Sequence, residues 1–446
     1  MPTRSRSHPR TSDARLALTL AGQAARAGAL YSRDSLTGLL RRGDAEARGA
    51  IPTAFDPVSP AVLADPYPAY RELLEGDRLH HSARRREWIL SRYDDVHAAA
   101  RAHDRLSSAE GVTSYPSRTP MMLTSDRPDH TRLRRLAAGS FTHAAIEGWR
   151  PAVERLASKA IEAMLGKGGG CDAVAALAGP LPVATIARVL GIPEDDEPRF
   201  RQWSDSVVEG FGVEPGAGRV RSSAGVLGAT LRLHSYFLEL FSRRRRDPGD
   251  DVLSKLLASS DEGGLSEDEL FWFAFLLLIA GNETTTNLIG TMLLAFAEHP
   301  DEYARVAADP SLIRPAVEEA LRHTSPIQGM YRVARADHEV GDAVIPAGGR
   351  VLLLFGAANR DPRHFPEPDR FDVTRNPSDH LGFGTGIHFC LGAHLARLEA
   401  EVVLRLLTER VERMALAGEP LWRRNPALRG LDRLPLRLIP RCRPRV

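Results

Sequence analysis

The segment Ser266–His299 constrains the fold most strongly, because it predicts one long helix with an apolar middle. Apolar residues recur along it at three- and four-residue spacing, and Phe271–Ile279 contains apolar residues only. Three further segments show the same spacing and also predict helices: Ala144–Leu165, Leu227–Arg244 and Gly386–Val411. The chain has 446 residues, of which 43% are hydrophobic, so these helices can enclose a large core.

Segments that predict strands are few and short. They are Glu87–Leu90, Glu339–Val344 and Arg350–Leu354, and the last two flank a turn that contains Pro and Gly. Residues 51–446 contain neither an internal repeat nor a low-complexity linker. We therefore expect one large, mainly α domain with small β-sheets over residues 51–446.

Charge is distributed unevenly along the chain. There are 59 Lys and Arg against 57 Asp and Glu, and this net charge of +2 argues against a dedicated nucleic-acid-binding protein. Residues 1–50 hold nine Arg and four acidic residues, a net charge of +5. We expect a basic, flexible N-terminal extension over residues 1–50, and favour a solvated tail over a partner-binding arm.

The three cysteines, Cys171, Cys390 and Cys442, include no CxxC pair. This count argues against a disulfide framework and against a zinc site made of cysteines. It suits a reducing compartment, so we expect a cytoplasmic protein. No stretch of about 18 apolar residues predicts a membrane span. Any chemistry on sulfur therefore depends on a single thiol.

Cys390 is the cysteine with the most informative surroundings. It lies in the Gly-rich segment Leu381–His394, which leads directly into a predicted helix. Glycines let backbone N–H groups approach a sulfur closely, and a helix N-terminus stabilises a thiolate. A zinc ion would need more ligands than the nearby His388 and His394 supply, whereas a thiolate-ligated haem needs one sulfur. A buried Cys beside a Gly-rich turn is the structural alternative.

The long predicted helix carries a polar group, Gly281-Asn-Glu283-Thr284, directly after its apolar stretch. Burying Glu283 there is costly unless the carboxylate has a function. Gly281 removes a side chain where a ligand could approach, and the acid and hydroxyl groups could pass protons. The alternative is a helix with a polar face and a threonine bonded to its own turn.

Two further pairs have a helical spacing. Glu319 and Arg322 are three residues apart, which is a commonplace ion pair on a helix. His130 and Arg134 are four residues apart and share one helical face, where they could clamp a carboxylate. A solvated basic face is the alternative for the second pair.

Together these motifs resemble the cytochromes P450, specifically the soluble bacterial type, from about Asp65–Tyr70 to Leu436. The pattern around the thiol matches the haem-binding signature of that family: Phe383-x-x-Gly386-x-His388-x-Cys390-x-Gly392. The resemblance implies haem b as the cofactor, with Cys390 as the iron ligand. It also implies that four side chains bind the haem propionates, namely His130, Arg134, Arg332 and His388.

The resemblance assigns further roles. Glu283 and Thr284 match the acid–alcohol pair that delivers protons during oxygen activation. Glu319 and Arg322, together with Arg370, match a structural ion-pair triad. By analogy with the family, the substrate pocket would include Ser114, Tyr115, Ala280, Gly281, Ile327, Gln328, Met330 and Tyr331.

The implied activity is that of a monooxygenase of bacterial secondary metabolism. It would insert one oxygen atom from O2 into a C–H bond of a medium-sized hydrophobic molecule such as a terpenoid, steroid, fatty acid or polyketide, by hydroxylation or epoxidation. Only 56 residues follow Cys390, too few for a fused reductase. Electrons would therefore come from NAD(P)H through a ferredoxin and a ferredoxin reductase, which could dock near His394 and Arg397. We expect a monomer.

Two alternatives stay open at this point. The same fold could act as a peroxide-driven peroxygenase or as an isomerase, although relatives with those activities usually lack the acid–alcohol pair. The chain could also be a haem-binding protein without turnover, which the same pair argues against.

Overall fold

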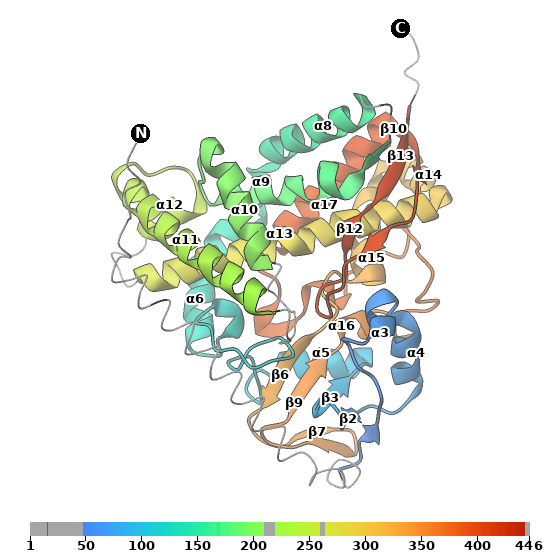
Figure 1. The fold of residues 1–446 in the computed structure, drawn as a ribbon. Coiled ribbons are helices and arrows are strands. Elements are labelled where there is room, and N and C mark those ends of the chain that lie inside the picture. The colour runs from blue at the N-terminus through green and yellow to red at the C-terminus, as the bar shows by residue number, and fades with distance from the viewer. Residues whose placement is uncertain are drawn as a thin grey trace.

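The computed structural model describes Leu16 and residues 48–166, 168, 170–208, 219–258 and 264–441. Most of the expected N-terminal extension and Cys442 lie outside these ranges. Helices dominate the molecule, and the strands gather at two edges (Figure 1). The predicted fold class, a mainly α domain with small sheets, is confirmed.

The long predicted helix is present as α13 (Glu267–Glu298). Ser266 caps it: its hydroxyl accepts a hydrogen bond from the Glu269 N–H, and the Glu269 carboxylate accepts one from the Ser266 N–H. Side chains on all sides of α13 are buried, as its apolar composition requires. The helix crosses the middle of the molecule, where α9, α10, α11, α15 and α17 pack around it (Figure 1).

The other helices, in chain order, are α3 (Pro60–Ala64), α4 (Tyr67–Glu75), α5 (Tyr93–Arg101), α6 (Asp129–Ala138), α7 (His143–Glu147), α8 (Arg150–Gly166), α9 (Pro180–Val189), α10 (Glu197–Val208), α11 (Arg219–Arg246), α12 (Val252–Ala258), α14 (Pro300–Ala308), α15 (Ile313–Thr324), α16 (Phe355–Ala358) and α17 (Ala393–Arg410). No helix in the described ranges is long and apolar enough to span a membrane.

The largest sheet has six strands in the order β1 (Ile51–Pro52), β2 (His80–Ser82), β3 (Glu87–Leu90), β9 (Arg350–Leu353), β6 (Met330–Ala334) and β4 (Leu106–Ser107). A three-stranded sheet joins β10 (Val411–Leu416), β13 (Pro435–Pro440) and β5 (Gly170–Asp172). Two hairpins complete the set: β7 (His338–Val340) with β8 (Ala343–Ile345), and β11 (Leu421–Trp422) with β12 (Leu431–Arg433).

Two predicted helices have different bounds in the structure. The segment Ala144–Leu165 forms two helices, α7 and α8, because Pro151 is tolerated only in the first turn of a helix. The segment Gly386–Val411 becomes α-helical only at Ala393, after one 3-10 turn over Gly386–His388. Gly386 has a φ of +71°, outside the helical region, and the chain up to Gly392 forms the loop around Cys390.

The predicted strands are found in place, except that one segment contains two strands. The segment Glu339–Val344 is a hairpin of β7 and β8, because Gly341 turns the chain with a φ of +60°. Strand β9 does not pair with the strand before it; it lies between β3 and β6. This central sheet brings Met330 and Arg332 of β6 towards the helical part of the molecule.

Candidate active site

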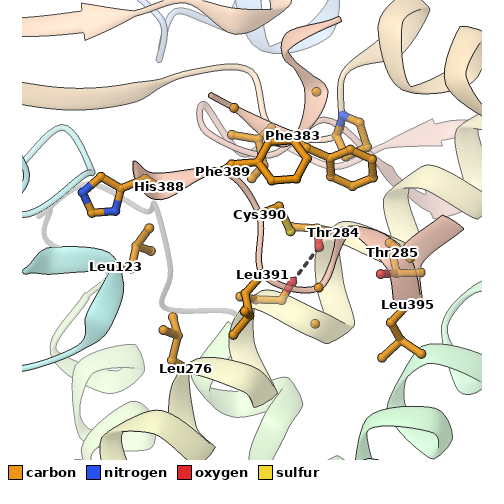
Figure 2. A pocket seen from close by; sticks show the side chains of 18 of the residues that line it. Leu123, Leu276, Thr284, Thr285, Phe383, His388, Phe389, Cys390, Leu391 and Leu395 are labelled. Carbon is orange, nitrogen blue, oxygen red and sulfur yellow. Dashed lines mark hydrogen bonds between the residues drawn. The ribbon is translucent and has the colours of Figure 1, made fainter. Parts of the chain in front are cut away.

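A cavity with a mainly apolar lining lies between α13 and the loop that carries Cys390. Figure 2 shows Leu276, Thr284 and Thr285 of α13 around the same cavity as Cys390.

The loop geometry fixes the position of Cys390. Gly384 and Gly386 both have a positive φ, and a Cβ on Gly386 would approach the Ala100 carbonyl oxygen to 3.0 Å. The Cys390 N–H donates to the Phe383 carbonyl oxygen at 2.9 Å, which closes the loop. The sulfur is thereby placed three residues before the start of α17 and lines the cavity.

Burial raises the pKa of the Cys390 thiol, while the Gly392 N–H and the charges of Arg134 and Arg397 act in the opposite direction. A bound metal ion would favour the thiolate further, because a coordinating thiol is deprotonated. In the described ranges no group of three or more His, Cys, Asp or Glu residues could hold a metal ion by itself. The donor set therefore fits a cofactor that brings its own remaining metal ligands, as haem does.

The four predicted propionate ligands, His130, Arg134, Arg332 and His388, all line this cavity. They come from α6, β6 and the Cys390 loop. The imidazole rings of His130 and His388 lie 4.4 Å apart, centroid to centroid. Burial and the neighbouring arginines lower the pKa of His130 to about 4 and that of His388 to about 2.

Arg332 is a buried cation on the wall of this cavity. Its side chain is 3% exposed, and burial lowers its pKa to about 10. Its guanidinium donates to the Tyr331 carbonyl oxygen at 2.8 Å, and within the described residues no carboxylate forms an ion pair with it. The charge of Asp126 acts on Arg332, but Asp126 already pairs with Arg335, so the cavity suits a further anionic group at this end. A haem propionate fits that requirement.

Thr284 lines the cavity and its hydroxyl donates to the Ala280 carbonyl oxygen at 2.6 Å (Figure 2). The hydrogen bond from the threonine to its own helical turn, which was the structural alternative, is therefore present, and Thr284 lines the cavity as well. Ala280 and Gly281 also line the cavity, as predicted. A Cβ on Gly281 would meet Ile186 of α9 at 3.3 Å, so the glycine also allows close packing of α9 on α13.

Glu283 is 7% exposed and lines a second, smaller cavity. Its carboxylate forms an ion pair with Arg423, which also donates to Asp432 at 2.7 Å. Sequence reasoning missed Arg423, because nothing in the local pattern of residues 421–433 links it to α13.

Some of the residues predicted to form the substrate pocket line these cavities, and others do not. Ile327 and Met330 line both cavities. Ser114 and Tyr115 line neither of them; the preceding residues Val112 and Thr113 line the second cavity instead.

Gln328 and Tyr331 also line neither cavity, so the prediction that they are polar groups of the pocket is wrong. The Gln328 amide donates to two main-chain carbonyl oxygens and accepts from the Tyr70 hydroxyl. The Tyr331 hydroxyl donates to Glu87 at 3.0 Å. Side chains alternate across a strand, so Met330 and Arg332 face the cavity while Tyr331 faces away from it.

The ion-pair triad has a different third member. Glu319 and Arg322 are fully buried and form two hydrogen bonds of 2.8 Å. Arg370 was the predicted third residue, but its side chain is 54% exposed and pairs with Glu367 and Asp372. Arg375 approaches Glu319 to 3.4 Å instead. Arg370 contributes only its carbonyl oxygen, which accepts from Arg322.

The predicted positive docking charge on Arg397 is already neutralised. Its guanidinium donates to both Glu318 oxygens, at 2.6 and 2.8 Å, and stacks over the Phe383 ring. The hydrogen bonds from Arg397 and His380 outweigh burial and lower the pKa of Glu318 to about 2. Arg397 therefore supports the Cys390 loop rather than offering a free charge.

Glu399 is a site residue that sequence reasoning missed. It is 1% exposed on α17 and lines the first cavity, and its Oε2 atom has no hydrogen-bond partner among the described residues. Burial raises its pKa to about 8, so the site favours the neutral carboxyl. The sequence does not reveal that Glu399 is buried, because its burial arises only when α17 packs against its neighbours.

Comparisons with known proteins agree with this arrangement. The family model described as Cytochrome P450 matches residues 232–413. The beta-dihydromenaquinone-9 omega-hydroxylase of Mycobacterium tuberculosis is 44% identical over 88% of this chain and 80% of its own length. The vitamin D(3) 25-hydroxylase of Pseudonocardia autotrophica is 41% identical over 84% of this chain and 94% of its own. A solved structure, CYP109Q5 from Chondromyces apiculatus, has a TM-score of 0.79 at 35% identity and covers 87% of this chain and 98% of its own.

Proposed function

This chain belongs to the cytochrome P450 family and is a monooxygenase, and from that premise we propose that it inserts one oxygen atom from O2 into a C–H bond of a medium-sized apolar molecule. Hydroxylation is the main outcome, and epoxidation follows where the substrate offers a double bond. The observation that carries the proposal is the position of the Cys390 thiol on the same cavity as the Thr284 hydroxyl. We assign residues 51–446 to the haem domain.

We propose that Cys390 ligates the haem iron and that His130, Arg134, Arg332 and His388 bind the propionates. The unpaired Arg332 guanidinium supports this assignment most directly. When bound, the haem supplies the activation of O2 and the oxidation of the C–H bond. Phe383, Gly386 and Gly392 shape the loop that presents the thiol.

We propose that Thr284 and Glu283 supply the protons for the reaction. The Thr284 hydroxyl lies on the wall of the first cavity, and Glu283 precedes it on α13. Both side chains line the second cavity, so one pocket connects the carboxylate with the hydroxyl. Positioned acid–base groups of this kind commonly contribute about 10²–10⁴-fold to a rate.

The substrate class is inferred from the cavity walls and from the two relatives. Apolar side chains dominate both cavities, among them Leu123, Leu276, Ile327 and Met330. The relatives are named as hydroxylases of a dihydromenaquinone and of vitamin D(3), which are both isoprenoid-derived molecules. Because a third relative, 39% identical, is named as a 6-deoxyerythronolide B hydroxylase, the proposed substrate class stays a medium-sized hydrophobic molecule such as a terpenoid, steroid, fatty acid or polyketide.

Electrons are proposed to come from NAD(P)H through a ferredoxin and a ferredoxin reductase. Reconstitution with these proteins should yield oxygenated product, whereas peroxide alone should yield little. Equal product formation with peroxide alone would favour the peroxygenase alternative.

The first experiment is the absorption spectrum of the reduced, carbon-monoxide-bound protein. We expect the thiolate-type spectrum in the wild type and in Cys171→Ser, and its loss in Cys390→Ser. An imidazole-type spectrum in the wild type would contradict the proposal. Titration with terpenoids, steroids, fatty acids and macrolides, followed by the shift of the haem spectrum, then tests the substrate class.

A further inference from the structure

Two polar side chains, Glu283 and Asn287, lie one turn apart on the buried part of α13. Residues four apart on a helix share a face, so both point towards the same neighbour. That neighbour is the β11–β12 hairpin, and β12 packs against α13 (Figure 1). Glu283 is 7% exposed and Asn287 is 1% exposed.

The hairpin supplies the cation for the buried acid. Arg423 follows β11 directly and its guanidinium contacts the Glu283 carboxylate. The same guanidinium donates to Asp432 of β12 at 2.7 Å, and the Asp432 side chain is 44% exposed. One arginine therefore links the buried carboxylate of Glu283 to a carboxylate at the surface.

Asn287 has unmet hydrogen-bonding capacity beside this ion pair. Neither its Nδ2 nor its Oδ1 has a partner among the described residues. A buried amide in that state is rare in folded proteins, and an ordered water is a common partner for such a group.

The backbone of the hairpin brings Asn287 and Arg423 together. The Arg423 N–H donates to the Gly430 carbonyl oxygen at 3.0 Å. A Cβ on Gly430 would overlap the Asn287 carboxamide, so the glycine is needed for this close approach. The unpartnered amide and the ion pair thus lie against adjacent positions of one hairpin.

We propose that the β11–β12 hairpin is the proton inlet of this enzyme, with Arg423 as the residue that positions Glu283 and Asn287 as the residue that holds a relay water. The inference rests on the proposed role of Glu283 and extends it from the cavity to the surface. A surface water gives a proton to the water on Asn287, that water gives one to the Glu283 carboxylate, and Glu283 passes it towards the Thr284 hydroxyl. Each relay group receives one proton and gives one, and no electron moves.

Arg423 stays protonated throughout, because a guanidinium does not release its proton in proteins. Its role is to keep Glu283 ionised and oriented. Without a cation, a buried carboxylate takes up a proton and its pKa rises. Glu283 would then stay protonated and could not accept the next proton from the relay water.

The test compares Arg423→Gln with Arg424→Gln in the haem-loaded protein. Arg424 is the exposed neighbour and forms no ion pair with the described residues, so it is the matched control. We expect Arg423→Gln to lower the product formed per NAD(P)H by at least about threefold, with matching peroxide release, because part of the acid–base contribution is lost. Arg424→Gln should behave as the wild type, and Arg423→Lys should recover part of the yield.

A second measurement does not depend on turnover. Infrared difference spectra against Glu283→Gln report whether Glu283 is ionised. We expect a carboxylate band in the wild type and a protonated carboxyl band in Arg423→Gln. A crystal structure of the haem-loaded protein should also show a water within hydrogen-bonding distance of Asn287.

The double variant Glu283→Gln/Arg423→Gln separates a positioning role from a general loss of structure. If Arg423 acts through Glu283, the double variant has the same yield as Glu283→Gln alone. A lower product yield in the double variant than in Glu283→Gln, or a crystal structure with no water at Asn287, would contradict the proposed proton inlet. If Glu283→Gln itself leaves the yield unchanged, the proposed role of Glu283 fails instead.

Discussion

Replacement of Arg322 by alanine should cost this protein much of its stability. The guanidinium is fully buried and donates twice to Glu319, at 2.8 Å each. It also donates to three main-chain carbonyl oxygens, those of Asn359, Pro368 and Arg370, at 2.9, 2.8 and 3.2 Å. One side chain therefore joins α15 to the irregular segment that precedes the Cys390 loop.

The magnitude follows from these contacts. Removal of one partner of a buried ion pair commonly costs about 3–5 kcal/mol, because the other charge stays buried. Each carbonyl oxygen that loses its donor without reaching water adds about 1–3 kcal/mol. Folded proteins are commonly stable by only about 5–15 kcal/mol, so the free energy of unfolding of Arg322→Ala should fall by half or more.

Two neighbouring arginines provide matched controls. Arg375→Ala should cost about 1–3 kcal/mol, because its 15% exposed side chain donates to Glu319 and to the carbonyl oxygens of Pro366 and Glu367. Arg370→Ala should cost at most about 1 kcal/mol, because its ion pairs of 3.6 and 3.7 Å are exposed and alanine keeps the main-chain carbonyl.

Urea unfolding followed by far-ultraviolet circular dichroism measures all three variants, and the absorbance ratio of haem to protein reports cofactor retention. The expected order of loss is Arg322, then Arg375, then Arg370. An Arg370→Ala variant as unstable as Arg322→Ala would refute the reasoning and restore the triad that the family resemblance implied.

Three further outcomes are expected. Thr284→Ala should keep the carbon-monoxide spectrum but lower product per NAD(P)H by about tenfold or more, because a proton donor on the cavity wall is lost; an unchanged yield would exclude that role. Gly430→Ala should lower stability by about 1–3 kcal/mol in thermal unfolding, because its Cβ would overlap Asn287; Gly139→Ala, with nothing within 4 Å of the new Cβ, is the control. The pKa of Glu399 rises from 4.5 to about 8 on folding, so the native state binds more protons in that window and wild-type stability falls there as pH rises. Relative to the wild type, Glu399→Gln should therefore gain stability between about pH 5 and about pH 8 in urea unfolding, by up to about 1.4 kcal/mol per pH unit; an equal difference at both pH values would contradict the burial argument.

Much of the site could be predicted without coordinates, because its parts are local in sequence. The glycines around Cys390 and the helix after it are read directly from the residues. His130 and Arg134 share a helical face, and both line the cavity. The apolar run before Glu283 predicts a buried helix, and α13 has nearly the predicted bounds.

Choices between similar residues could not be predicted in this way. Arg370 and Arg375 are both plausible partners for Glu319, and the path of an irregular segment decides between them. Gln328 and Tyr331 belong to a segment that borders the cavity. Strand pairing turns the Tyr331 side chain away from it, and the Gln328 amide bonds to carbonyl oxygens at the end of α15 instead.

The sequence by itself therefore determined the fold class, the single chemically important thiol and the helix that faces it. These depend on periodicity and on short motifs, which act over a few residues. Only the tertiary structure decided the ion-pair partners, the direction of each side chain in β6 and the burial that raises the pKa of Glu399. Arg423 meets Glu283 across a long stretch of chain, and such contacts, like the loss of water that shifts a pKa, arise only when distant elements pack together.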